Sequence, residues 1–104
     1  MDRVAMLRQM IEKRPEDPFP RYGLAMELRT AKRLDESWVL FEGLMTDMAD
    51  YLPTYLMAGN LLQSMGRIDE ARGVLDRGME VAKKAGDGHT LGELEAAKAE
   101  LDEV

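Results

Sequence analysis

Few residues in this sequence could perform chemistry. The single histidine, His89, lies in the stretch "DGHT", where an imidazole could act as a general base or as a metal ligand. Either role needs partner groups, and the chain has no cysteine and no second histidine to join it. A polar loop ahead of a helix explains His89 without any reaction. We therefore expect no catalytic residue.

Calcium binding is a second candidate, because "GDGHTLGEL" (86–94) weakly resembles a calcium-binding loop. If Gly88 occupied the turn position of such a loop, the loop would begin at Lys83 and end at Leu94. Both positions require carboxylates, so calcium is rejected. No glycine-rich phosphate loop follows a strand pattern either. The sequence thus predicts no metal, no cofactor and no enzyme.

The composition narrows the class of partner. A net charge of −6 repels phosphate backbones and argues against nucleic acid. No stretch approaches the roughly 18 apolar residues of a membrane span. The opening "MDRVAMLRQM" is charged and amphipathic, unlike a secretory signal. We expect a soluble, cytoplasmic protein without a membrane partner.

The elements that would position any site are helices. Apolar residues recur at spacings of three and four, and no segment alternates as a strand would. Asp17 can cap one helix, and Thr90 with Glu93 forms the pattern of a capping box for the last one. The expected helices cover 2–13, 20–31, 35–49, 53–65, 68–84 and 90–103.

A 34-residue repeat runs through these helices. The stretch "RLDES" (33–37) returns as "RIDEA" (67–71), and a fixed period in this range is typical of stacked repeats. We expect Asp35 and Asp69 at helix N-termini, where a carboxylate accepts backbone N–H bonds. The same shift aligns residues of similar size: Leu28 with Leu62, Lys32 with Gly66, Leu34 with Ile68, Ser37 with Ala71, Phe41 with Leu75, and Met45 with Met79.

The motif in residues 52–85 resembles the tetratricopeptide repeat, a helix–turn–helix unit. Small residues are expected where the paired helices approach closely, and Gly66 is expected in the turn between them. Lys83 stands where the family often has proline, so the second helix should run on to Ala85 and stop at Gly86. The matching pattern reads Tyr55-x2-Ala58-Gly59-x2-Leu62, then Gly66, then Ala71-x3-Leu75.

The resemblance implies an all-α fold, a TPR-like alpha–alpha superhelix (solenoid) of about six antiparallel helices. It covers nearly the whole chain. Residues 2–14 match a second helix without its first, and residues 90–103 match a first helix without its second, which would act as a cap. We expect one domain, 1–104, with a half repeat at 2–14, repeats at 18–51 and 52–85, and a capping helix at 90–103.

The resemblance also implies a binding surface, because the first helix of each unit lines a concave groove in this family. Tyr22 and Met26 stand where some members hold a carboxylate with Lys and Asn, so that clamp is absent. A protein or peptide partner in an apolar groove is the first hypothesis, with Tyr22 and Met57 as anchors. The groove residues are Phe19, Tyr22, Met26, Arg29, Leu56, Met57, Asn60 and Gln63.

A homo-oligomer formed through the exposed ends of the stack is the alternative hypothesis. The chain contains nine methionines, whose flexible side chains adapt to irregular surfaces. Half repeats at both ends would leave apolar helix faces available to a second copy.

Overall fold

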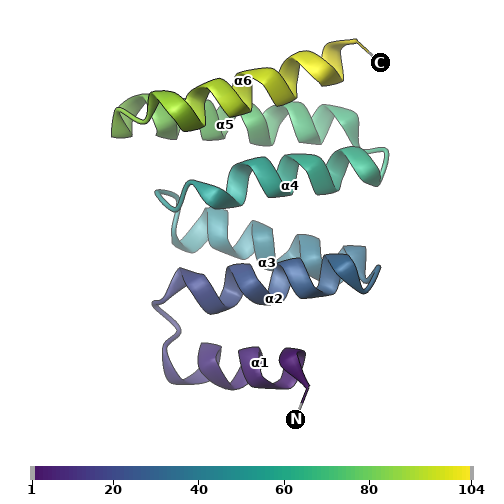
Figure 1. Cartoon of the computed structure of the whole chain (residues 1–104), viewed down its shortest axis with the longest axis vertical. Coiled ribbons are helices and arrows are strands. Elements are labelled where there is room, and N and C mark those ends of the chain that lie inside the picture. Colours follow the sequence, from purple (N-terminus) through teal and green to yellow (C-terminus); the bar gives the residue numbers. More distant parts are fainter. Residues whose placement is uncertain (1, 104) are drawn as a thin grey trace. The chain divides into compact units, whose positions relative to one another are not determined.

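A computed structural model describes residues 2–103, which form six α-helices and no strand. Figure 1 shows the helices joined by short turns. The predicted all-α fold of six helices is confirmed. None of the described helices is long and apolar enough to cross a membrane. The helices are α1 (Arg3–Lys13), α2 (Pro18–Thr30), α3 (Leu34–Asp47), α4 (Pro53–Ser64), α5 (Ile68–Ala85) and α6 (Gly88–Asp102).

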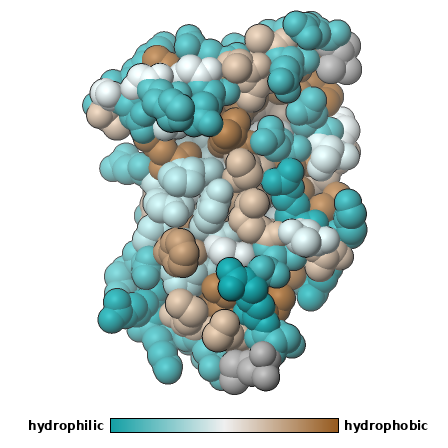
Figure 2. Space-filling model, viewed as in Figure 1, coloured by the Kyte–Doolittle hydropathy of each residue, from teal (hydrophilic) through white to brown (hydrophobic). Residues whose placement is uncertain are grey.

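The chain divides into two compact units, Met1–Tyr51 with α1 to α3 and Leu52–Val104 with α4 to α6. The division falls where the sequence places the boundary between its two repeats. The expectation of one domain stays a prediction. The visible surface is largely hydrophilic, with separate brown patches of hydrophobic residues (Figure 2).

In the first unit, α2 packs against both α1 and α3. Leu7, Leu24 and Leu28 form a buried cluster in this unit. The Ser37 hydroxyl donates a 2.7 Å hydrogen bond to the Ala25 carbonyl oxygen, so this buried polar group is satisfied. The small residue predicted at this contact therefore joins α2 and α3 both by its size and by a hydrogen bond.

In the second unit, α5 packs against both α4 and α6. A Cβ atom at Gly59 would lie 2.6 Å from Leu75 Cδ2, which no ordinary contact allows. The predicted close approach at Gly59 is thus confirmed. Gly78, which the sequence did not single out, is as constrained, because a Cβ there would lie 2.5 Å from the Cβ of buried Tyr55.

Helices α2, α4 and α5 end in the same way. A residue just past the end of each helix adopts a left-handed conformation: Lys32 and Gly66 lie two residues after α2 and α4, and Gly86 lies directly after α5, with φ of 66°, 77° and 70°. The following N–H groups bond back to Leu28, Leu62 and Ala82 respectively, which is the Schellman motif. The turn at Gly66 and the end of α5 at Ala85 are as predicted.

The predicted places of Asp35 and Asp69, in the first turns of α3 and α5, are confirmed, but the predicted hydrogen bonds from their carboxylates to backbone N–H groups are wrong. Neither helix has a side-chain cap, because the N-cap positions are Arg33 and Arg67 and the aspartates lie two residues later. Instead, each arginine makes a forked ion pair with the glutamate three residues on. Arg33 reaches Glu36 at 2.9 and 2.7 Å, and Arg67 reaches its glutamate, Glu70, at 2.8 and 2.6 Å. Asp35 and Asp69 add negative charge to the first turn, and Asp69 also accepts a 3.2 Å hydrogen bond from Arg72.

The predicted capping box of α6 is also wrong. The helix begins at Gly88, earlier than expected, because Asp87 is its N-cap. The Asp87 carboxylate accepts from the Thr90 backbone N–H at 3.0 Å and from the Thr90 hydroxyl at 2.7 Å. These bonds lower the pKa of Asp87. Glu93 lies instead 3.4 Å from His89.

Replacing Lys32 by glycine should stabilise the protein. The left-handed conformation costs a non-glycine residue about 1–2 kcal/mol, and the greater freedom of glycine in the unfolded chain offsets part of this gain. We expect Lys32→Gly to raise the free energy of unfolding by about 0.5–1 kcal/mol in urea titration. Gly66→Lys, at the equivalent turn, should lower it. A Lys32→Gly variant that is less stable than the unchanged chain, or a Gly66→Lys variant that is more stable, would contradict the strain argument.

The two glycines of α5 should respond oppositely to alanine. Gly78→Ala should overpack the contact with Tyr55 and cost about 1–3 kcal/mol. Gly73 has no side-chain neighbour within 4 Å, so Gly73→Ala should stabilise by about 1 kcal/mol through helix propensity. Thermal denaturation of both variants measures the difference. A Gly78→Ala variant as stable as Gly73→Ala would refute the close contact.

Candidate partner-binding surface

The four residues predicted on α2 lie along one side of that helix. Phe19, Tyr22, Met26 and Arg29 follow spacings of three and four, and Leu24 and Leu28 are buried on the opposite side. Phe19 is 63% exposed, and the other three are half-buried. An exposed phenylalanine is uncommon enough to mark a contact surface when other apolar residues adjoin it.

The four residues predicted on α4 share one side of that helix in the same manner. Leu56, Met57, Asn60 and Gln63 are all half-buried, whereas Leu62 on the other side is fully buried. Each unit therefore carries the expected kind of surface on its own first helix. The side of α4 combines the apolar side chains of Leu56 and Met57 with the amides of Asn60 and Gln63, which can form hydrogen bonds with a peptide backbone.

Tyr22 belongs to an aromatic cluster within the first unit. Its ring meets buried Phe41 edge to face at a centroid distance of 6.2 Å, and Tyr51 at 5.8 Å. Burial, and next the charge of Tyr51, raises the pKa of Tyr22, whereas Arg29 opposes the rise. The pKa of Tyr51 is raised by burial and by Asp17. Both phenols therefore stay protonated at neutral pH and can donate hydrogen bonds.

A hollow of about 440 Å³ lies beside this cluster, between the loop that precedes α2 and the loop that follows α3. Pro18, Met48 and Tyr51 give it apolar walls. The sequence reasoning missed it, because loops carry no periodic signal. The only hint was an aromatic residue, Tyr51, beside acidic ones. Its full lining is Glu16, Pro18, Asp47, Met48, Ala49, Asp50 and Tyr51.

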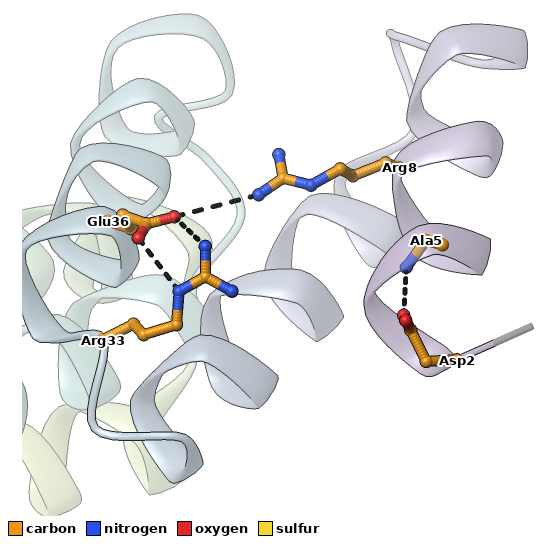
Figure 3. Close-up of polar contacts among 5 residues, drawn as sticks. All are labelled: Asp2, Ala5, Arg8, Arg33 and Glu36. Carbon is orange, nitrogen blue, oxygen red and sulfur yellow. Dashed lines mark hydrogen bonds and ion pairs between the residues drawn. The ribbon is translucent and has the colours of Figure 1, made fainter.

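A second hollow, of about 410 Å³, lies at the other end of α1 and contains three arginines. Figure 3 shows Arg8 reaching from α1 toward Glu36, whose carboxylate also holds the fork of Arg33. Arg3 pairs with Glu27 at 2.5 Å. Because each guanidinium already faces a carboxylate, this hollow has the features of a structural ion-pair network and not of an anion site.

The side chains that could catalyse a reaction or bind a metal do not come together in one site. His89 has a side chain that is 86% exposed and contacts only Glu93 among the ion pairs of the described residues. Within residues 2–103, no group of three or more His, Cys, Asp or Glu side chains could hold a metal ion.

Helix pairs with small residues at their contacts, joined by identical turns, define a helical-repeat scaffold. The solution structure of a tetratricopeptide repeat domain protein from Salinibacter ruber is 37% identical to this chain. The match has a TM-score of 0.82 and covers 86% of this chain and 91% of that one. A crystal structure of a tetratricopeptide repeat domain protein from the same organism matches at 36% identity and a TM-score of 0.79, covering 86% and 99% of the two chains.

The chain belongs to the tetratricopeptide repeat family. A protein from Bordetella parapertussis shares the fold at 18% identity, with a TM-score of 0.83 over 99% of this chain and 90% of that one. No protein-family model and no curated protein matches the chain. Proteins of this family generally serve as non-enzymatic modules for protein–protein interaction.

Phe19 and Tyr22 should differ sharply in their effect on stability. Tyr22→Ala removes two edge-to-face contacts, each worth about 0.5–1.5 kcal/mol, and should lower the melting temperature. Phe19→Ser removes an exposed ring and should change the free energy of unfolding by no more than about 0.5 kcal/mol. Differential scanning calorimetry decides, and equal melting temperatures for the two variants would show that the Tyr22 cluster is misassigned.

Proposed function

We propose that this protein is a non-catalytic adaptor that binds a peptide or helical segment of a protein partner. The segment lies against the apolar side of α2 in the first unit or of α4 in the second, the helices that the family resemblance assigns to a concave groove. The observation that carries the proposal is Phe19, an aromatic side chain left 63% exposed at the start of α2. The charged, acidic composition fits a protein of the cytoplasm.

The chemistry of the first unit specifies the kind of segment. An apolar side chain of the partner contacts Phe19 and Met26, because burying apolar area against them removes both surfaces from water. The Tyr51 hydroxyl is available to donate to a backbone carbonyl. Carboxylates of the neighbouring hollow favour Lys or Arg next to that apolar residue.

Val39 provides a matched control for Phe19. It is also 63% exposed, but it lies on α3, the second helix of its repeat. A serine at either position removes one exposed apolar side chain. Only the Phe19 change touches the proposed surface.

The test is a selection from a displayed library of random peptides, followed by affinity measurement on the enriched sequences. We expect peptides with an apolar residue beside Lys or Arg. Phe19→Ser should weaken them about 30-fold, since an aromatic anchor contributes about 2 kcal/mol. Val39→Ser should leave the affinity unchanged. Enriched peptides that bind Phe19→Ser fully but lose affinity for Val39→Ser would place the binding surface on the second helices.

Self-association through the ends of the chain is the second candidate function. One observation favours it: Met6 and Met10, one turn apart on α1, are 43% and 40% exposed.

A further inference from the structure

The hollow of about 440 Å³ beside Tyr51 combines an apolar lining with an acidic one. Pro18 and the ring of Tyr51 are half-buried, whereas the carboxylates of Glu16 and Asp50 are exposed. The volume lies within the range of about 300–1,000 Å³ that is usual for ligand pockets. All of these residues belong to the first unit. The hollow is therefore large enough to receive a long side chain of a partner.

The negative charge of this hollow is only partly neutralised within the chain. Arg21 of α2 places its Nη1 atom 2.9 Å from the Asp47 carboxylate, so that charge is already paired. Among the described residues, no ion pair involves Glu16 or Asp50. Two carboxylates are thus available to a cation from another molecule. An exposed ion pair alone contributes little, so a specific ligand must also use the apolar lining.

The Tyr51 ring provides that lining in a fixed orientation. It meets the Tyr22 ring edge to face at a centroid distance of 5.8 Å, which restricts its rotation before anything binds. A ring held in this way contacts a cation without a further loss of side-chain entropy. The charge of Asp17 also reaches the ring, because burial, and next that charge, raises the pKa of the Tyr51 phenol. A cation is therefore attracted to the ring and to the carboxylates around it.

We propose that this hollow binds an arginine side chain of the partner and discriminates against lysine. The proposal rests on the proposed function and narrows the Lys or Arg expected there to arginine. A guanidinium is planar, stacks on aromatic rings and donates several hydrogen bonds in a fork, whereas an ammonium is compact and strongly hydrated. Only the guanidinium can cover the Tyr51 ring and bond a carboxylate at the same time. The first unit already contains such a fork, between Arg33 and Glu36.

The place of the hollow on the chain determines where the arginine stands in the partner segment. Pro18, which lines the hollow, directly precedes the exposed Phe19. The Asp17 carboxylate, whose charge acts on Tyr51, accepts a 3.0 Å hydrogen bond from the Phe19 backbone N–H. The hollow therefore adjoins the apolar contact at Phe19. In an extended segment, alternate side chains lie about 6.6 Å apart, so we expect the arginine within about two residues of the apolar anchor.

The experiment is an NMR titration of the 104-residue chain with N-acetyl-arginine amide. The corresponding lysine and citrulline amides are matched probes, because citrulline has nearly the shape of arginine without its charge. We expect the arginine probe to shift the signals of the Tyr51 ring and the Met48 methyl group. The lysine probe should bind about fivefold more weakly. The citrulline probe should bind about tenfold more weakly, which corresponds to about 1.4 kcal/mol.

Three results of this titration would overturn the proposal. Equal binding of the lysine probe would show a general cation site, and equal binding of the citrulline probe would show that charge is not used. Absence of any shift at Tyr51 with the arginine probe would show that the hollow does not bind this side chain.

Neutral substitutions identify the charges that act. Glu16→Gln and Asp50→Asn each remove one exposed charge and keep the shape of the side chain, so together they should weaken the arginine probe about tenfold. Glu42→Gln is the control, because Glu42 is exposed on α3, lies outside the lining and takes part in no ion pair of the described residues. It should leave the affinity unchanged. An equal loss in Glu42→Gln would show an effect of net charge alone and contradict the proposal.

The peptides that test the proposed function separate the two claims. Replacing the arginine of an enriched peptide by citrulline should weaken binding to the unchanged chain about tenfold, but should have little effect on the Glu16→Gln, Asp50→Asn double variant. Peptides that lose affinity for Phe19→Ser yet tolerate citrulline would leave the proposed function standing and overturn the arginine site. If no peptide is enriched, the proposed function fails, whereas the titration with the arginine probe still decides the site.

Discussion

The close approach of paired helices is the constraint on which the rest of this structure depends. Three of the helix pairs have small residues near their contact: Gly23 against Leu7, Ser37 against Ala25, and in the α4–α5 pair both Gly59 against Leu75 and Gly78 against Tyr55. Where a glycine takes this place, a neighbouring leucine or tyrosine fills the space. Because the helices approach through these positions, their other sides are left for solvent or for partners. The packing contacts thus decide which residues are available for binding.

This constraint explains how much of the fold the sequence predicts. Periodicity identifies all six helices, and the shift of 34 identifies Gly59, Ala71 and Gly66, because packing and turn geometry restrict the residue type at these positions. Lys32 follows the same register as Gly66 and adopts the same left-handed turn without being glycine. Repeat alignment therefore predicts backbone conformation even where the local residue disfavours it.

Helix starts were less predictable because several residues compete to satisfy the same N–H groups. The Asp87 carboxylate accepts a hydrogen bond from the Thr90 N–H, although the capping-box pattern predicted Thr90 itself as the capping residue. Arg33 occupies the N-cap position of α3, although an aspartate was expected to bond the N–H groups there. The candidate surface divides in the same way. Its helical residues follow from periodicity, whereas the loop hollow at Tyr51 depends on two segments that the sequence cannot place together.

The side of α2 that we propose as a binding surface must meet two physical requirements. A binding helix face must stay exposed while its own unit folds, which Phe19 does and Tyr22, held by Phe41 and Tyr51, does only in part. The Tyr22 ring therefore serves the packing of its own unit, whereas the Phe19 ring does not. A substitution at Phe19 can for this reason test the proposed surface without a loss of stability, and a substitution at Tyr22 changes both at once.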